Sequence, residues 1–296
     1  MIYNTEYGIG KEPRDAFLTF SSPNPFSIKT YNSRKNWDGI LEYSTDLVNW
    51  EEWNGSNISA IQRNDGYVLY FSGTGNTVIA GNGSKYRWVL TGSNILCIGN
   101  IENLLDYATV ASGNHPTMAT NCYSYMFDSC SSLTHAPSLP ATTLAEMCYR
   151  SMFHGCSSLT QAPSLPATTL AVRCYYGMFH GCSSLTQAPS LPATTLAEMC
   201  YNSMFHMCSS LTHIPALPAT TLVKGCYQNM FNNCKSIKLS TTQIGEYTQE
   251  YRIPTAGTGT TVTDSLNQMF TLTGGTFVGD PSINTTYYLD SSNTIV

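Results

Sequence analysis

Ten of the eleven cysteines recur with a fixed period, and they are the first residues in the chain that could do chemistry. They form two columns, which are Cys122, Cys148, Cys174, Cys200 and Cys226, and Cys130, Cys156, Cys182, Cys208 and Cys234. Structural zinc sites need closely paired cysteines of the C-x-x-C type, and no such pair occurs. On stacked units the cysteines of one column would lie about 4.8 Å apart, which leaves a ladder of disulfides open. We expect free, buried thiols that act as small apolar side chains.

Histidines and glutamates recur with the same period, at His154, His180 and His206 and at Glu146 and Glu198. Histidines on adjacent units could share a metal ion, but neutral imidazoles on a solvated surface are the ordinary outcome. A glycosidase needs two carboxylates about 5–9.5 Å apart, and Glu146 and Glu198 would lie about 10 Å apart at exposed capping positions. No phosphate-binding loop or nucleophile elbow is present. The sequence therefore predicts no catalytic residue, no metal site and no cofactor.

These residues belong to a 26-residue unit that is written four times and begins a fifth time between residues 122 and 240. A period of 20–50 residues predicts a stacked array, because one unit cannot bury its own apolar face. In every unit Cys, Tyr, Met, Phe and Cys fall at positions that would form one apolar stripe on a helix. The expected repeat core consists of Cys122, Met126, Phe127, Cys130, Cys148, Met152, Phe153, Cys156, Cys174, Met178, Phe179, Cys182, Cys200, Met204, Phe205, Cys208, Cys226, Met230, Phe231 and Cys234.

The rest of the unit predicts a short strand after that helix. Thr143 and Glu146 have capping-box spacing at the helix start, and Gly155 suits its end. The segment 159–166 is bounded by prolines, and Pro163 would limit a strand there to two or three residues. Helix plus short strand in 26 residues is the layout of a leucine-rich repeat, whose units have about 20–29 residues.

The residues Phe153-His-Gly-Cys156-Ser-Ser-Leu159-Thr resemble the BspA-type leucine-rich repeats of bacterial surface proteins. The Met-Phe pair is similar to the MF repeats of mycoplasma surface lipoproteins. The resemblance covers about 120 of the 296 residues, and it departs from the family in unit length and in an extra proline. The segment 41–50 looks like β-modules that flank such repeats in gut bacteria and their phages. The resemblance implies an extracellular or adhesive recognition protein with no catalytic residues to carry over.

The predicted fold is multidomain, with three parts. Residues 1–105 hold six short β-type runs separated by turns, which predict an antiparallel β-sandwich with its tryptophans in core and hairpin packing. Residues 106–240 would form an α/β leucine-rich-repeat-like solenoid of 26-residue units, closed at its start by a helix at 100–107. Residues 241–296 would form a small C-terminal cap or assembly segment, with a short helix at 265–270.

Composition excludes some partners. Charged residues make up 11% of the chain, far below the roughly 25% of typical soluble proteins. The net charge of −5 provides no electrostatic footprint for nucleic acid. No apolar run approaches the ~20 residues of a membrane helix, so no membrane insertion is expected. Residues 1–20 lack the apolar region of a signal peptide.

Surface-type repeats without an export signal favour a phage virion appendage, such as a tail or head fibre component. It would be a non-enzymatic attachment protein, made in the host cytoplasm, that contacts a host cell-surface glycan or protein. Its N-terminal domain would bind other virion proteins, and homo-oligomerisation is left open. The alternatives are a BspA-like bacterial adhesin, secreted or at the cell surface, and a purely structural virion decoration or spacer. The exposed repeat positions expected to contact a ligand are His154, His180, His206, Gln161, Gln187, His213, Arg150 and Tyr176.

Overall fold

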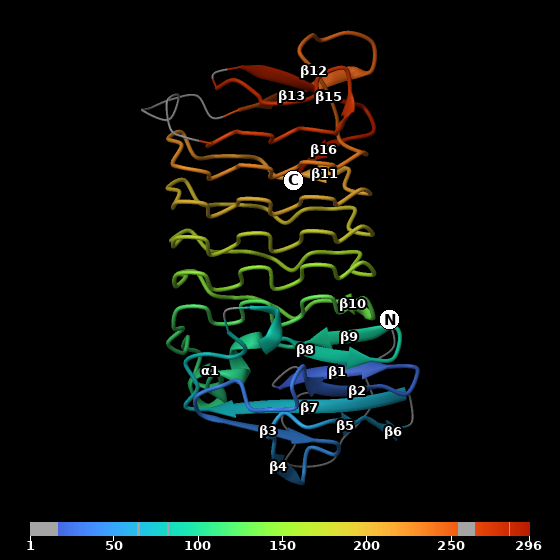
Figure 1. Cartoon of the computed structure of the whole chain (residues 1–296), viewed down its shortest axis with the longest axis vertical. Coiled ribbons are helices and arrows are strands. Elements are labelled where there is room, and N and C mark those ends of the chain that lie inside the picture. Colours follow the sequence, from blue (N-terminus) through green and yellow to red (C-terminus); the bar gives the residue numbers. More distant parts are fainter. Residues whose placement is uncertain (1–16, 64–65, 82, 254–263, 284) are drawn as a thin grey trace.

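The computed structural model describes residues 17–63, 66–81, 83–253, 264–283 and 285–296, which form one long column (Figure 1). The N-terminal strands lie at one end of the column, the repeats form its middle, and the C-terminal strands lie at the other end. Most of the segment used to argue against a signal peptide, residues 1–16, lies outside the described residues. No helix in the described ranges is long and apolar enough to cross a membrane.

Two sheets form the N-terminal end. The larger sheet has the order β10-β9-β1-β7-β3-β4, with β6 also paired to β7. Its strands are β1 (Leu18–Ser22), β3 (Ile40–Ser44), β4 (Trp50–Glu52), β6 (Ile61–Arg63), β7 (Gly66–Thr74), β9 (Ile95–Ile98) and β10 (Leu133–His135). The smaller sheet has the order β5-β2-β8. Its strands are β2 (Ser27–Thr30), β5 (Ile58–Ser59) and β8 (Trp88–Thr91).

Aromatic side chains fill the space between these sheets. Trp88 of β8 lies 5.2 Å from Phe71 and 6.1 Å from Phe20, ring centroid to ring centroid. Trp53 stacks on Trp37 at 5.1 Å and meets Trp88 edge-on at 4.8 Å. The expected antiparallel sandwich fits only in part, because β10 comes from the first repeat unit and pairs parallel to β9. The larger sheet therefore extends into the repeats.

The predicted α/β leucine-rich-repeat-like solenoid is wrong. The only α-helix among the described residues is α1 (Tyr107–Ala111), which precedes the repeats. The stretch 122–236, described in full, contains only two strands, β10 and β11 (His213–Ile214), together with isolated bridges. A leucine-rich-repeat solenoid needs a strand in every unit so that the units build one continuous ladder. The molecule is instead nearly all β-structure and turns, with several small sheets.

Each Cys-Tyr-x-x-Met-Phe-x-x-Cys segment is a run of tight turns. Residues in the left-handed conformation recur at least at every fourth position. In the third unit, whose first cysteine is Cys174, they are Arg173, Gly177 and Gly181, with φ of 56°, 59° and 76°. Alternate amides bond within a turn and between units. Met152 N–H donates to the Tyr149 carbonyl at 3.2 Å, whereas Phe153 N–H donates to the Met178 carbonyl of the next unit at 2.9 Å. These inter-unit bonds hold the turns in register along the column.

A period of four explains why the sequence pattern suggested a helix. Side chains at i, i+1, i+4, i+5 and i+8 share one face of a helix with 3.6 residues per turn. In a run of four-residue turns the same positions are the two inward-pointing residues of each turn. Over nine residues the two periods place the same side chains inside, but the left-handed residues exclude a right-handed helix.

The repeat core consists of aligned columns of identical side chains. All twenty of the Cys, Met and Phe positions named above are buried. Successive phenylalanine rings are stacked with centroids 5.6–5.7 Å apart, as between Phe153 and Phe179 and between Phe179 and Phe205. The second cysteine column hydrogen-bonds to the backbone, since Cys182 Sγ donates to the Phe153 carbonyl at 3.1 Å. All eleven cysteines are free and buried.

A sixth, degenerate unit follows the five. Tyr227 and Phe231 donate their amides to the carbonyls of Ser265 and Met269, as they would to a following repeat. Phe270 stacks on Phe231 at 5.5 Å. The predicted helix at 265–270 is therefore wrong, and this segment closes the stack of turns.

The C-terminal strands cover that end of the column. One sheet has the order β13-β15-β12-β14. Its strands are β12 (Lys238–Ser240), β13 (Tyr247–Arg252), β14 (Gly274–Gly275) and β15 (Thr286–Asp290). The last strand, β16 (Thr294–Ile295), returns to pair parallel with β11.

The segment between the N-terminal sheets and the repeats is a short cap. A 3-10 turn, η3 (Ile101–Leu104), precedes α1, so the helix predicted at 100–107 is wrong in its bounds. Asn100 caps η3 and Asp106 caps α1 through their side chains. One buried cluster of side chains runs from Leu18 to Leu289. The boundaries predicted at residues 105 and 240 stay predictions.

Candidate binding surfaces

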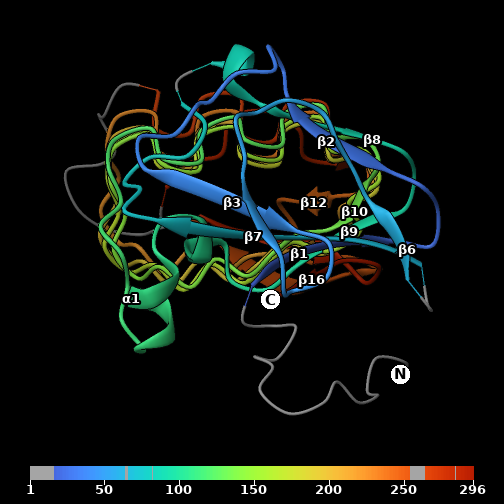
Figure 2. The same ribbon diagram turned by 90° about the horizontal axis from the view of Figure 1, so that it is seen from below.

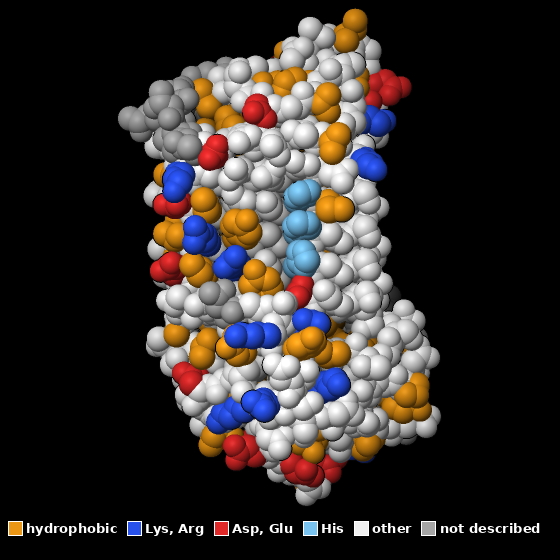
Figure 3. Space-filling model, viewed as in Figure 1, with side chains coloured by type: hydrophobic (Ala, Val, Ile, Leu, Met, Phe, Trp, Pro, Cys, Tyr) orange, Lys and Arg blue, Asp and Glu red, His pale blue; other side chains and the backbone are white. Residues whose placement is uncertain are grey.

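Three of the predicted ligand-contacting residues form a column on the surface of the repeats: His154 meets His180 edge-on, and His180 stacks on His206. Their ring centroids are 4.7 Å apart between His154 and His180 and 4.5 Å apart between His180 and His206. Figure 3 shows the histidines as a line of side chains along the repeats. Asp128 takes the equivalent position in unit one, and its Oδ1 lies 2.6 Å from His154 Nδ1. The column thus begins at a carboxylate.

Backbone hydrogen bonds set the spacing of this column. Each histidine carbonyl accepts a hydrogen bond from a backbone amide of the preceding unit. The donor is the left-handed residue directly after the histidine position of that unit. Gly155 donates to His180 at 2.7 Å, and Gly181 donates to His206 at 2.8 Å. The register therefore comes from the main chain, so the side chain at this position is free to vary.

Burial keeps the inner histidines neutral. Burial, together with the smaller effect of the neighbouring His206 and His154, lowers the pKa of His180 to about 4. Burial also lowers the pKa of His206. At neutral pH each of these two rings therefore carries one donor and one acceptor nitrogen.

Arg150 and Tyr176 form a second column on the same turns. The Arg150 guanidinium lies 5.5 Å from the Tyr125 ring centroid and 5.2 Å from that of Tyr176, so two aromatic rings hold it. The column continues with Asn202 and Gln228, joined by a hydrogen bond of 2.7 Å. We call the histidine column together with Arg150 and Tyr176 the histidine face.

The other three predicted residues, Gln161, Gln187 and His213, lie on another side of the repeats. Parallel bridges join Gln161 to Gln187 and Gln187 to His213, so the three residues form a row. The first repeat contributes β10 to this row, and β10 pairs with β9. The turns of the histidine face instead follow β8, because Trp88 N–H donates to the Met126 carbonyl at 2.7 Å. Seen along the column, β8 and the β9–β10 row are separate segments of the coil (Figure 2). The structure thus brings five of the eight predicted residues together and separates three.

Metal binding and acid–base chemistry find little support in the described part of the chain. It contains no group of three or more histidine, cysteine, aspartate or glutamate side chains placed to hold a metal ion. Glu198 pairs with Lys224 at 3.0 Å, and Glu146 is exposed.

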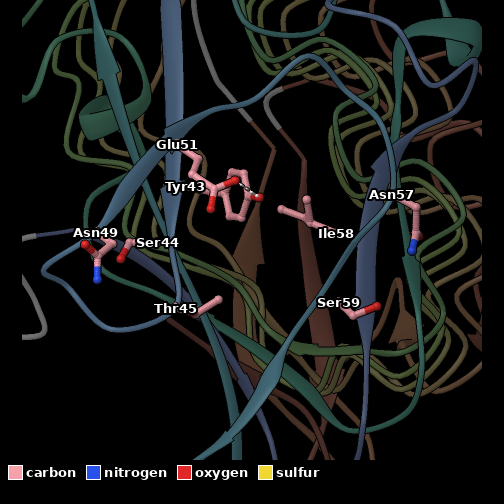
Figure 4. Close-up of a pocket in the computed structure, with 8 residues that line it drawn as sticks. All are labelled: Tyr43, Ser44, Thr45, Asn49, Glu51, Asn57, Ile58 and Ser59. Carbon is pink, nitrogen blue, oxygen red and sulfur yellow. Dashed lines mark hydrogen bonds between the residues drawn. The ribbon is translucent and has the colours of Figure 1, made fainter.

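A shallow hollow of about 300 Å³ lies beside the β3–β4 hairpin (Figure 4). The Tyr43 hydroxyl donates to Glu51 Oε2 at 2.7 Å, and this bond raises the pKa of Tyr43. Figure 4 shows Asn57 and Ser59 well apart from that pair, across the hollow. Because its polar groups do not converge on one point, the hollow defines no reaction centre.

Comparisons with known proteins found no match: no family model, no curated protein and no solved structure matches the chain. The resemblance to BspA-type repeats accordingly stays a prediction.

Two residues that contact the histidine face, Asp128 and Tyr125, were not predicted from the sequence. Asp128 is buried, and its Oδ1 contacts His154 Nδ1. The sequence signal for this contact is the 26-residue spacing between Asp128 and His154, which places the acid next to the histidine of the following unit. Tyr125 provides one of the two rings against Arg150.

Proposed function

We propose that this protein is a non-enzymatic recognition protein that binds a cell-surface glycan chain along the histidine face. The observation that carries the proposal is the register of that face. Like side chains recur at 4.5–4.7 Å, on a backbone that inter-unit hydrogen bonds hold in place.

A repeating face suits a repeating ligand. A sugar chain offers hydroxyl groups at regular steps, and neutral imidazoles can both donate to hydroxyls and accept from them. The rings of Tyr125 and Tyr176 supply apolar faces with a polar tip, which suit the C–H face of a sugar ring. Because the columns are already ordered, little side-chain entropy is lost on binding.

The same features argue against turnover. The histidines contact one another and Asp128, and no described acid pair flanks the column in the way that glycoside hydrolysis requires. Support for a polar, weakly charged ligand comes from the composition, in which charged residues are only 11%.

The test is binding of the labelled full chain to candidate host bacteria before and after periodate oxidation of their surface glycans. We expect saturable binding that oxidation abolishes. The triple variant H154A/H180A/H206A should weaken binding at least tenfold, and R150A should weaken it further. The matched control is Q161A/Q187A, which changes a different row of the same units and should bind normally.

Four outcomes would contradict the proposal. Binding that survives periodate would point to a protein receptor. Equal loss in the control variant, or none in the histidine variant, would show that the histidine face is not the site. Shortening of the purified polysaccharide during incubation would contradict the non-enzymatic assignment.

The biological setting stays a prediction. A phage virion appendage predicts that the chain co-purifies with particles, whereas an adhesin predicts that it remains with bacterial cells. A structural spacer predicts that neither side of the repeats binds any surface.

A further inference from the structure

A second hollow, of about 340 Å³, lies where the cap meets the first repeat. One wall is the segment 141–145, and the other contains Glu102, His115, Pro116 and Met118. Inside the array the corresponding segments cover one another, since Leu144 N–H donates to the Thr169 carbonyl of the next unit at 3.0 Å. The segment 141–145 belongs to the first repeat, so the side that points away from the second repeat faces the cap. The hollow is therefore a consequence of where the array begins.

A buried carboxylate lies at the back of this hollow. Glu102 is 1% exposed, and its Oε2 lies 2.8 Å from His115 Nδ1. Burial raises the pKa of Glu102, while hydrogen bonds from His115 and Asn100 act in the opposite direction. A buried acid costs stability unless it is well paired, and an apolar residue of similar volume would serve a purely structural role as well or better.

The carboxylate fixes the orientation of the histidine. With Nδ1 held by Glu102, the proton of the neutral ring resides on Nδ1 and Nε2 becomes the acceptor. The His115 side chain is 53% exposed and lines the hollow. Nε2 has no partner among the described residues. A buried acid thus presents one oriented acceptor to a cavity.

The rest of the lining determines the kind of ligand. Thr142 and Thr143 are exposed and bring two hydroxyl groups, whereas Met118 and Leu144 are apolar. No lysine or arginine lines the hollow, so it is not suited to a phosphate or a carboxylate. A concave, partly apolar site with a few polar groups is the usual form of a small-molecule pocket.

We propose that this hollow binds a small, neutral, hydroxylated ligand of the size of one sugar residue. A ligand hydroxyl donates to His115 Nε2, the threonine hydroxyls bond to its other oxygens, and the apolar side chains cover its C–H face. The site shares no residue with the histidine face and does not depend on the function proposed for that face.

The test is an NMR titration of the full chain, labelled at histidine, with glucose, galactose and N-acetylglucosamine as probes. We expect at least one sugar to shift the His115 ring resonances saturably and to leave those of His135, an exposed histidine of the first repeat, unchanged. His115→Phe keeps a ring but loses the acceptor, so binding should weaken at least about fivefold, the effect of losing one hydrogen bond.

The repeats offer a matched pair of threonine variants. Thr143→Val changes the hollow, whereas Thr195→Val changes the same position two units away. The first should weaken sugar binding and the second should not, with equal melting temperatures confirming the fold of both. The proposal is overturned if no sugar gives a saturable shift, if His115→Phe binds as the parent does, or if both valine variants behave alike. Saturation by choline but by no sugar would also overturn it, because the site would then select a cation.

Discussion

Replacing His180 by asparagine should make the protein less sensitive to acid. The chain itself offers this substitution, because Asn232 occupies the equivalent position in unit five. His180 lies between two other imidazoles at 4.7 Å and 4.5 Å, and burial together with those rings lowers its pKa from 6.5 to about 4. Protonating it in the folded state places a positive charge inside a stack of rings.

The sign and size of the effect follow from proton linkage. Between pH 6.5 and 4 the unfolded chain binds a proton at His180 that the folded chain does not, so the free energy of unfolding falls as the pH falls. A shift of roughly 2.5 units corresponds to at most about 3 kcal/mol. Because the side chain is only partly buried, solvent screening reduces this to about 1–2 kcal/mol.

Urea unfolding at pH 7.5 and pH 4.5 measures the difference. Between these pH values the parent should lose about 1–2 kcal/mol more than H180N, because the contributions of most other titrating groups cancel between the two proteins. H135N, which alters an exposed histidine, is the control and should follow the parent. If H180N and the parent lose the same stability, the histidines do not form the half-buried column described above.

Three further results are expected. Phe179→Ala removes the middle ring of the phenylalanine column and should lower the free energy of unfolding by about 3–5 kcal/mol in urea melts, and a loss below 1 kcal/mol would contradict the packing. Burial raises the pKa of Cys226 to about 11 and that of Cys174 to about 12. Mass spectrometry should therefore find no maleimide adduct on the native chain at pH 7 and eleven after denaturation, and fast native labelling would refute this. Deleting residues 153–178, one full unit, should preserve a cooperative melt because every inter-unit bond can re-form, whereas deleting half of that length should abolish it.

The period and the core could be read from the sequence, but the backbone conformation could not. Cys148, Tyr149, Met152, Phe153 and Cys156 alternate in pairs with polar residues, and this alternation identifies the buried side chains under either a helical or a four-residue period. The decision between them depends on left-handed residues, which are not all glycine or asparagine. Met147, with φ of 56°, is an example. Long-range hydrogen bonds hold such residues in place, and no local pattern reports those bonds.

The sixth unit escaped notice for a related reason. Met269-Phe270 repeats the Met230-Phe231 pair, but an insertion between the units displaces it from the 26-residue period, and Ser265 replaces the first cysteine. The structural equivalence rests on backbone bonds such as Tyr227 N–H to the Ser265 carbonyl at 3.0 Å. The sequence also did not show that Gln161, Gln187 and His213 lie apart from the other five predicted ligand residues. Only the backbone register shows which side of the coil each residue occupies.

The main chain, and not the side chains, determines the spacing of the histidine face. The amides of Gly155 and Gly181 donate to histidine carbonyls of the following unit at 2.7 and 2.8 Å. The equivalent amide of Met207 donates to the Asn232 carbonyl at 2.9 Å, although the acceptor residue there is not a histidine. Asp128 and Asn232 occupy the same column as the histidines without disturbing it. The inward columns have no such freedom, because each ring packs on the ring of the next unit. Substitutions on the face should therefore change what the protein binds at little cost in stability, whereas substitutions inside should unfold it.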